Sequence, residues 1–336
     1  MKLLSSTPFA CTLLSLALSA ACYADVPIKP KRPPCGCGSL RLLEPKYKKR
    51  LVEAQKKYGA DSIEVARILV PLAVAYRKAE EFNKGEPLLT RALTIESRAA
   101  KPDIAATVRI QTNLGAIYAA TERKELAETT LKKALSTEKQ ELGHDHELTA
   151  DTLHELGSLY SSLGRYSEAE SNLLSALAIR EKLRPPRDLD SLAELRTLSA
   201  LYLKMSDLPK AEPILRKQVA IGEKTWGPHS YSVVWYVEQL ADVYHRQGNA
   251  AKAAPLWKRL IAERDKTYGP MSPRLIGPLV RYAESLKKLK RNQESAAMEA
   301  RARAVISANR RNAEADSPDS LSGKTVANAA KGVAKQ

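Results

Sequence analysis

The sequence predicts an all-α protein, a solenoid of stacked helix pairs, and two observations lead to this prediction. The first is composition. Only 2 Phe and 15 Gly occur among 336 residues, whereas strong helix formers fill most of the chain. The second is a repeat of 42 residues through the middle of the chain, which is typical of repeat architectures. This composition disfavours a β-sandwich, a fibrous chain and a glycine-rich phosphate loop. A hydrophobic content of 44% also disfavours wholesale disorder.

Four columns of residues define the repeat. A tyrosine recurs at intervals of 42 residues, at Tyr76, Tyr118, Tyr160, Tyr202 and Tyr244. A leucine precedes each tyrosine by one helical turn, at Leu72, Leu114, Leu156, Leu198 and Leu240. A small residue follows in each unit, at Gly85, Ala127, Ala169, Ala211 and Ala253. A large apolar residue comes one turn later, at Leu89, Leu131, Leu173, Leu215 and Trp257. These four columns stay in phase over five repeats, and each repeat is one unit.

Each unit is expected to form two helices. Leu153, Leu156 and Tyr160 have the spacing of one buried helix face. A polar break around Gly164 ends this first helix, and the second helix follows with Ala169 in the small-residue column. We expect this column to lie where the two helix axes approach most closely, because only a small side chain fits there.

The corners between units also repeat. They contain glycines, and we expect each of these to be the left-handed residue that ends a helix. These glycines are Gly59, Gly143, Gly227 and Gly269. Residues 44–58 correspond to the second helix of a unit and form an N-terminal half-repeat. Residues 274–303 form a sixth, degenerate unit that caps the solenoid. The solenoid is therefore expected to span residues 44–303. Residues 304–336 would be the end of the last helix and a disordered tail.

The first 24 residues are expected to be a signal peptide. Lys2 precedes an apolar stretch, which small residues follow up to Ala24. This layout predicts an exported protein, periplasmic or secreted, and disfavours a nucleic acid as the partner. Processing as an outer-envelope lipoprotein, with lipidation of Cys22, is the alternative. No later segment is long and apolar enough for a transmembrane helix.

Residues 25–43 form a proline-rich linker with two cysteines. Cys35 and Cys37 are separated by a single glycine, so they are candidates for a local, strained disulfide or an intermolecular crosslink. A redox or metal role for this arm is an alternative. Metal binding would need further ligands, and none lies nearby in the sequence.

The net charge of +16 is unevenly distributed. The basic excess lies in residues 25–58 and 246–303, whereas residues 59–245 are nearly neutral. The basic ends are therefore candidates for contact with an anionic membrane surface.

The columns resemble those of tetratricopeptide repeats. The order of leucine, small residue, tyrosine, alanine, leucine and alanine matches at Leu114, Gly115, Tyr118, Ala127, Leu131 and Ala134. The corner at residues 143–146 and the length of the repeat are similar to the kinesin-light-chain type. The resemblance covers about residues 44–303. It implies a right-handed superhelix whose concave face, lined by the first helix of each unit, binds peptides or proteins.

The resemblance also indicates which residues face this groove. They occupy the unburied positions of the first helices and are Arg67, Arg109, Thr112, Asn113, Asp151, His154, Arg196, Trp235 and Glu238. Arginines there can hold carboxylates through paired hydrogen bonds, and Trp235 can serve as an aromatic anchor. Asn113 stands where the family often places an asparagine that holds the backbone of an extended peptide.

Enzymatic chemistry is not expected. The chain lacks the sequence motifs of serine hydrolases, zinc proteases and phosphate-binding loops. His144 and His146 fall in a corner between units, where a turn explains them better than a metal. We therefore expect a non-enzymatic binding scaffold or adaptor with no cofactor and no metal. The alternatives are a thiol or metal function of the Cys35–Cys37 arm and a membrane-surface adaptor held by the basic segment 46–57. The oligomeric state stays open.

Overall fold

The structure is a computed structural model that describes residues 37–183 and 191–315. The expected signal peptide, Cys22, Cys35 and the residues after 315 lie outside this range. Within it the chain forms α-helices and one short 3-10 helix, η1, and no strand. The helices are α2 (Cys37–Tyr58), α3 (Ile63–Lys78), α4 (Phe82–Arg98), α5 (Ile104–Ala120), α6 (Lys124–Glu141), α7 (Glu147–Ser162), α8 (Tyr166–Lys182), α9 (Leu192–Lys204), α10 (Leu208–Trp226), α11 (Tyr231–Arg246), α12 (Ala250–Tyr268), η1 (Pro273–Leu275), α13 (Ile276–Lys288) and α14 (Asn292–Ala315).

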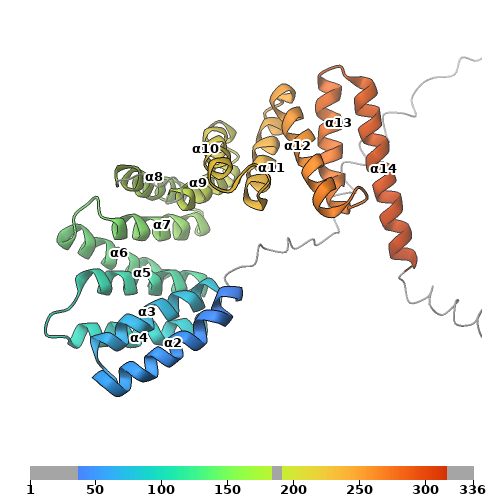
Figure 1. Ribbon diagram of the computed structural model, residues 1–336. Helices are drawn as coiled ribbons and strands as arrows, with labels where there is room; N and C mark the ends of the chain where they lie inside the picture. The colour runs from blue at the N-terminus through green and yellow to red at the C-terminus, as the bar shows by residue number, and fades with distance from the viewer. Residues whose placement is uncertain (1–36, 184–190, 316–336) are drawn as a thin grey trace, which may run out of the picture.

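The helices stack in chain order (Figure 1). After the single helix α2, they form six antiparallel pairs, from α3 with α4 to α13 with α14, and each pair packs on the next. First helices of successive pairs also contact one another directly, from α3 through α5 and α7 to α9. They therefore line the inner, concave side of the stack. Most contacts link nearest neighbours, as in a solenoid, which confirms the all-α prediction.

The predicted columns form the core. The small residues at Ala127, Ala169, Ala211 and Ala253 are fully buried, which fits a close approach of the two helices in each pair. The glycine after the column leucine marks an even closer approach in two units. A Cβ at Gly157 would lie 2.6 Å from Cγ of Leu173.

In several units a polar contact of the column tyrosine ties the unit to the one before. The hydroxyl of Tyr76 donates to Glu44 at 2.9 Å, and that of Tyr202 donates to Glu170 at 3.0 Å. Tyr160 does the same with Glu128 at 3.1 Å. Burial, followed by the Glu44 carboxylate, raises the pKa of Tyr76 to about 12. A lysine or arginine of the same unit covers each tyrosine ring. Each tyrosine thus joins its own unit to the preceding one.

The glycine corners have positive φ, as expected. Gly59, Gly143, Gly227 and Gly269 have φ between 79° and 93°. At Gly227 the ψ of 162° places the residue in a region that only glycine adopts readily. The turns inside the units also need a residue with positive φ. Gly164 supplies it in one unit, whereas Glu122 adopts φ 61° at the same position of another.

Both ends of the solenoid extend further than the repeat pattern indicates. Helix α2 begins at Cys37, so the end of the expected linker is helical. Helix α14 continues to Ala315, past the expected end of the cap at residue 303. In the sixth unit Leu286 and Ser295 are buried and Glu299 is exposed. No helix in the described part of the chain is long and apolar enough to span a membrane.

Candidate binding site

The structure places the nine predicted groove residues on the first helices, but not all of them are accessible. Arg67, Arg109, Arg196 and Trp235 are exposed. Asn113, Asp151, His154 and Glu238 are partly buried. Thr112 is buried with 6% exposure, so the expectation of an open groove position is wrong for this residue. Its hydroxyl lies 2.7 Å from that of Thr152 and donates to the Val108 carbonyl, because α5 and α7 pack closely there.

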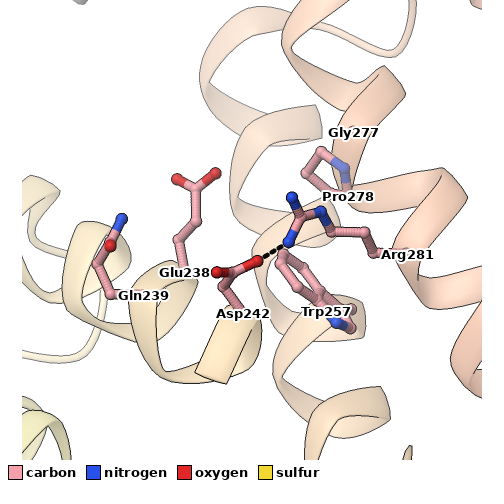
Figure 2. A pocket seen from close by; sticks show the side chains of 7 residues that line it. All are labelled: Glu238, Gln239, Asp242, Trp257, Gly277, Pro278 and Arg281. Carbon is pink, nitrogen blue, oxygen red and sulfur yellow. Dashed lines mark ion pairs between the residues drawn. The ribbon is translucent and has the colours of Figure 1, made fainter. Parts of the chain in front are cut away.

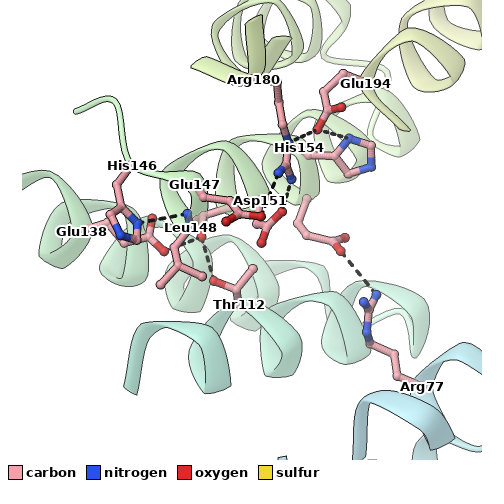
Figure 3. Close-up of polar contacts among 12 residues, drawn as sticks. Arg77, Thr112, Glu138, His146, Glu147, Leu148, Asp151, His154, Arg180 and Glu194 are labelled. Atoms are coloured by element: carbon pink, nitrogen blue, oxygen red, sulfur yellow. Dashed lines mark hydrogen bonds and ion pairs between the residues drawn. The ribbon is translucent and has the colours of Figure 1, made fainter. Parts of the chain in front are cut away.

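Five of the nine predicted residues line one cavity of about 440 Å³, here called the polar cavity. It extends from α3 across α5 and α7 to α9, along the inner side of the stack (Figure 3). The residues that matter for its chemistry are Arg77, Arg109, Thr112, Asn113, Glu147, Asp151, His154, Glu155, Arg180 and Glu194. The polar cavity is therefore lined by both basic and acidic side chains.

Arg180 organises the acidic end of the polar cavity. Its side chain is 12% exposed and forms ion pairs with Glu147 at 3.4 Å, with Asp151, and with Glu194 at 3.4 Å. Figure 3 shows these carboxylates gathered around the guanidinium group. Burial raises the pKa of Asp151 despite the neighbouring Arg180, and the charges of Glu147 and Glu194 raise it further. Three carboxylates thus share one cation.

Two atoms at this end lack hydrogen-bond partners among the described residues. They are Oε2 of Glu194 and Nδ1 of His154. Glu194 is only 1% exposed, and its other oxygen lies 3.8 Å from Nδ1 of His154. A buried carboxylate oxygen without a partner is costly, and a ligand group could satisfy it.

A buried polar chain lies beneath the polar cavity. Glu138 of α6 has no exposed surface. One of its oxygens accepts a hydrogen bond from Thr152 at 2.8 Å, whereas the other has no partner among the described residues. Burial raises the pKa of Glu138 to about 7. The carboxyl group therefore titrates near neutral pH.

Arg67 and Arg109 border a second cavity of about 530 Å³ between α3 and α5. Its lining is largely aliphatic and includes Val70, Pro71 and Val74. Val74 and Arg109 also line the polar cavity, so the two cavities are neighbours. Asn113 folds back on its own helix, because its amide donates to the Arg109 carbonyl at 2.8 Å.

A third cavity of about 570 Å³, here called the aromatic pocket, lies between α11, α12 and α13. Tyr231, Trp235 and Tyr268 line it with exposures of 45%, 39% and 41%. The guanidinium of Arg274 stacks on Tyr268 at 4.5 Å. Glu238 pairs with Arg264 at 2.5 Å, so this carboxylate is already neutralised. The aromatic pocket therefore combines exposed rings with charged side chains, among them Arg264, Arg274 and Glu263.

A smaller cavity of about 240 Å³ adjoins the aromatic pocket, because both are lined by Glu238 and Pro278 (Figure 2). Asp242 and Arg281 form an ion pair inside it. The same guanidinium lies 5.6 Å from the ring centre of Trp257. This ion pair connects α11 to α13 across the edge of the core.

Sequence reasoning missed the residues at the acidic end of the polar cavity and the buried Glu138. Arg180 and Glu138 lie on second helices, which we did not expect to reach the groove. A signal was present, because Glu96, Glu138, Arg180 and Arg264 occupy one position of the repeat. That position is in the last part of each second helix, and from there Arg180 and Arg264 line cavities. Arg196, by contrast, was predicted but lines none of the cavities described above.

No group of three or more His, Cys, Asp or Glu side chains suited to a metal is found in residues 37–183 and 191–315. The corner histidine His146 has a structural contact, since its Nδ1 accepts a hydrogen bond from the Leu148 amide at 3.2 Å, at the start of α7. Asp145 pairs with Lys182 at 3.0 Å. The arm cysteines stay untested, since Cys35 and the Cys37 side chain are outside the described part.

Comparison with known proteins identifies the repeat. A family model described as Tetratricopeptide repeat matches residues 64–139 and residues 107–182. No curated protein matches the chain.

Three similar solved structures share the fold. A putative kinesin light chain from Podosopora anserina is 24% identical, with a TM-score of 0.50, over 61% of this chain and 97% of its own. The quorum sensor NprR from B. thuringiensis is 14% identical, with a TM-score of 0.53, over 80% of this chain and 83% of its own. The apo form of RapI is 20% identical, with a TM-score of 0.50, over 80% and 93%. Residues 64–182 therefore consist of tetratricopeptide repeats, and the helix pairs that follow continue the same solenoid fold.

Proposed function

We propose that this protein is a non-enzymatic scaffold that binds an extended segment of a partner protein on its concave face. One observation supports this best. The polar cavity spans four successive first helices and holds buried polar atoms without partners among the described residues. Because the cavity runs across several neighbouring helices, it suits an elongated ligand. Its surface is already formed, so the protein needs little ordering on binding.

The groove arginines also support peptide binding. Arg67 and Arg109 form no ion pair within the described residues, whereas Arg77 and Arg180 of the polar cavity are paired. An exposed guanidinium without a protein partner is available for carboxylates or backbone carbonyls of a ligand. The exposed rings of the aromatic pocket offer anchoring surface at the other end.

Partner capture from a cell-envelope extract tests this function. Immobilised wild-type chain is compared with the Arg109→Glu and Asn113→Ala variants, and bound proteins are identified by mass spectrometry. Arg98→Glu is the matched control, because Arg98 is an exposed arginine of α4 that lines none of these cavities. We expect Arg109→Glu to reduce capture at least about tenfold while helicity and Arg98→Glu stay as wild type. Equal capture by the Arg98 and Arg109 variants would reject the groove.

We also propose that the protein is exported, with residues 1–24 removed. The support is the sequence layout around Ala24. Mass spectrometry of the mature N-terminus tests it. A chain that begins at Asp25 is expected. A lipid-modified N-terminal Cys22 would show a lipoprotein instead, and an intact Met1 would contradict export.

One observation favours membrane-surface binding as a second candidate function. Helix α2 leaves Leu42 and Val52 exposed, at 79% and 64%, among exposed lysines such as Lys46 and Lys49. Exposed apolar residues within a basic helix suit an anionic bilayer. Vesicle sedimentation with anionic lipid tests this candidate. Binding that Lys46→Glu and Lys49→Glu weaken would support it, and absence of binding at low salt would exclude it.

A further inference from the structure

The acidic end of the polar cavity carries more negative charge than its cation balances. Glu147, Asp151 and Glu194 converge on the single guanidinium of Arg180. Within ion-pair distance of these three carboxylates, the described residues add only His154, at 3.8 Å from Glu194, and it is charged only when it is protonated. Two negative charges are therefore left without a cation while His154 is neutral. Such charges in a partly desolvated place attract a cation strongly.

Glu194 shows where that cation would lie. The residue is 1% exposed and lines the polar cavity. Its Oε2 is buried and has no hydrogen-bond partner in the described part of the chain. The second oxygen of this carboxylate is shared between Arg180 and His154. This unpartnered oxygen thus belongs to a carboxylate that α9 places beside the carboxylates of α7 (Figure 3).

We propose that Glu147, Asp151 and Glu194 form a pocket for a basic side chain, the ammonium group of a lysine or the guanidinium group of an arginine in the bound partner segment. This inference rests on the concave-face binding proposed above and specifies its ligand. A lysine ammonium supplies three donors and an arginine guanidinium five, and either satisfies Oε2 of Glu194. The cavity volume of about 440 Å³ leaves room for such a side chain and adjoining backbone.

The opposite end of the polar cavity gives the bound segment a direction. Arg77 on α3 is held by Glu155 at 3.3 Å, whereas Arg109 on α5 has no ion pair within the described residues. The free positive charge therefore lies towards α3 and α5, and the excess negative charge towards α7 and α9. A segment with a basic residue near α9 fits this polarity, and an acidic residue there would meet like charge.

Selection from a random peptide library tests the proposal. A phage-displayed dodecapeptide library is panned against the immobilised full chain and against the Glu194→Gln and Glu147→Gln variants. Glu181→Gln is the matched control, because this carboxylate is 49% exposed on α8 and pairs with Lys217 outside the polar cavity. We expect lysine or arginine to be enriched at one position with the wild type and the control. The enrichment should disappear with Glu194→Gln.

The variants separate a binding effect from misfolding. Glu147 is 69% exposed, so its substitution cannot disturb the core, and circular dichroism checks helicity for Glu194→Gln. Peptides selected without a basic preference, or with one that Glu194→Gln preserves, overturn this inference but leave concave-face binding intact. A library that yields no bound peptide overturns both.

A synthetic copy of a selected peptide then measures the contact. Fluorescence polarisation should show at least about tenfold weaker binding when its basic residue is replaced by norleucine, and no such loss on Glu194→Gln. The chain's own residues Lys29, Lys31 and Arg32 offer a competing occupant. Equal affinity of the peptide for the wild type and for a chain with these three changed to Gln supports a partner segment. Tighter binding to the changed chain would assign the pocket to the arm and overturn a partner as its occupant.

Discussion

The polar cavity and the aromatic pocket occupy equivalent surfaces of different units, yet only the aromatic pocket is lined by exposed aromatic rings. At one position of the repeat the first helices carry Arg109, Asp151 and then Trp235. The N-terminal units therefore present charges, several of them buried. The C-terminal units present exposed rings beside carboxylates that are already paired.

The core residues do not differ between the N-terminal and C-terminal units in this way. Leu173 and Leu215 are fully buried at one position of the repeat, and Trp257 replaces them with 2% exposure. The Tyr–Glu hydrogen bond occurs in the first, third and fourth units. Fold and groove chemistry therefore use separate positions of the same repeat, so the groove can differ between units while their packing stays constant.

The largest loss of stability is expected at Trp257, because this residue serves both the core and a cavity. Its ring is both core and a wall of the small cavity beside the aromatic pocket. Trp257→Ala should lower the free energy of unfolding by about 3–5 kcal/mol because it leaves a large void. Urea unfolding followed by circular dichroism measures this. Trp257→Leu, which restores the residue of the other units, should cost less, and an equal cost would show that volume is not the cause.

Glu138 should give the polar region a pH dependence. Its folded pKa of about 7 lies above the ordinary 4.5, so the folded state binds the proton more tightly than the unfolded state. Stability should be greatest below about pH 4.5 for this group and fall as pH rises through 7, by on the order of 3 kcal/mol. Glu138→Gln should flatten this dependence in thermal melts between pH 5 and 8. The exposed Glu168→Gln should leave it unchanged, and a retained slope in the Glu138 variant would contradict the assignment.

The next largest effect on stability should come from the spacing between the two helices of a unit. A Cβ at Gly157 would lie 2.6 Å from Leu173 and 3.2 Å from the Ala169 carbonyl oxygen. Gly157→Ala should therefore cost about 1–3 kcal/mol by overpacking. The same position in the fifth unit is Ala241, which is fully buried. Ala241→Gly should cost only about 0.5–1 kcal/mol. Chemical denaturation of both variants checks the order, and a cost of Gly157→Ala no greater than that of Ala241→Gly would contradict the close approach of the helices at Gly157.

The smallest effect is expected in the turns inside the units. Gly164 has φ 75°, whereas Glu122 holds φ 61° at the same place of the repeat. Gly164→Ala should destabilise the chain by about 1 kcal/mol, since an L-residue is strained there. Glu122→Gly should be neutral or slightly stabilising. Thermal melts of the two variants compare them, and a destabilising Glu122→Gly would show that this side chain has a favourable contact that compensates for the strain.

The sequence was sufficient for the fold because its signals are periodic. Tyr160, Leu173 and Ala169 repeat in phase, and a solenoid is determined by contacts between neighbouring units. The helix ends were less accessible, since no periodic residue marks the start of α2 at Cys37. Thr112 shows a further limit. Its position is open in other units, but here α5 and α7 pack closely enough to bury it against Thr152.

The polar cavity could be predicted only in part. Arg109, Asp151 and His154 were found because they lie on the first helix. Arg180 was not, because it reaches the cavity from the end of a second helix through a long side chain. Glu194 lies between Arg180 and His154 through contacts across three helices. Such convergence depends on how the units are rotated relative to one another, which a one-dimensional pattern does not contain.

The tyrosine that bonds to the preceding unit has a mechanical consequence. Because Tyr76, Tyr160 and Tyr202 each fasten one unit to the one before, a pull on the two ends of the chain loads these links in series. No long-range strand pairing shares the force within the described residues. Stretched units would give way one after another, and each would release on the order of 140 Å of extended chain. A scaffold of this kind would therefore lengthen in steps of one unit under tension.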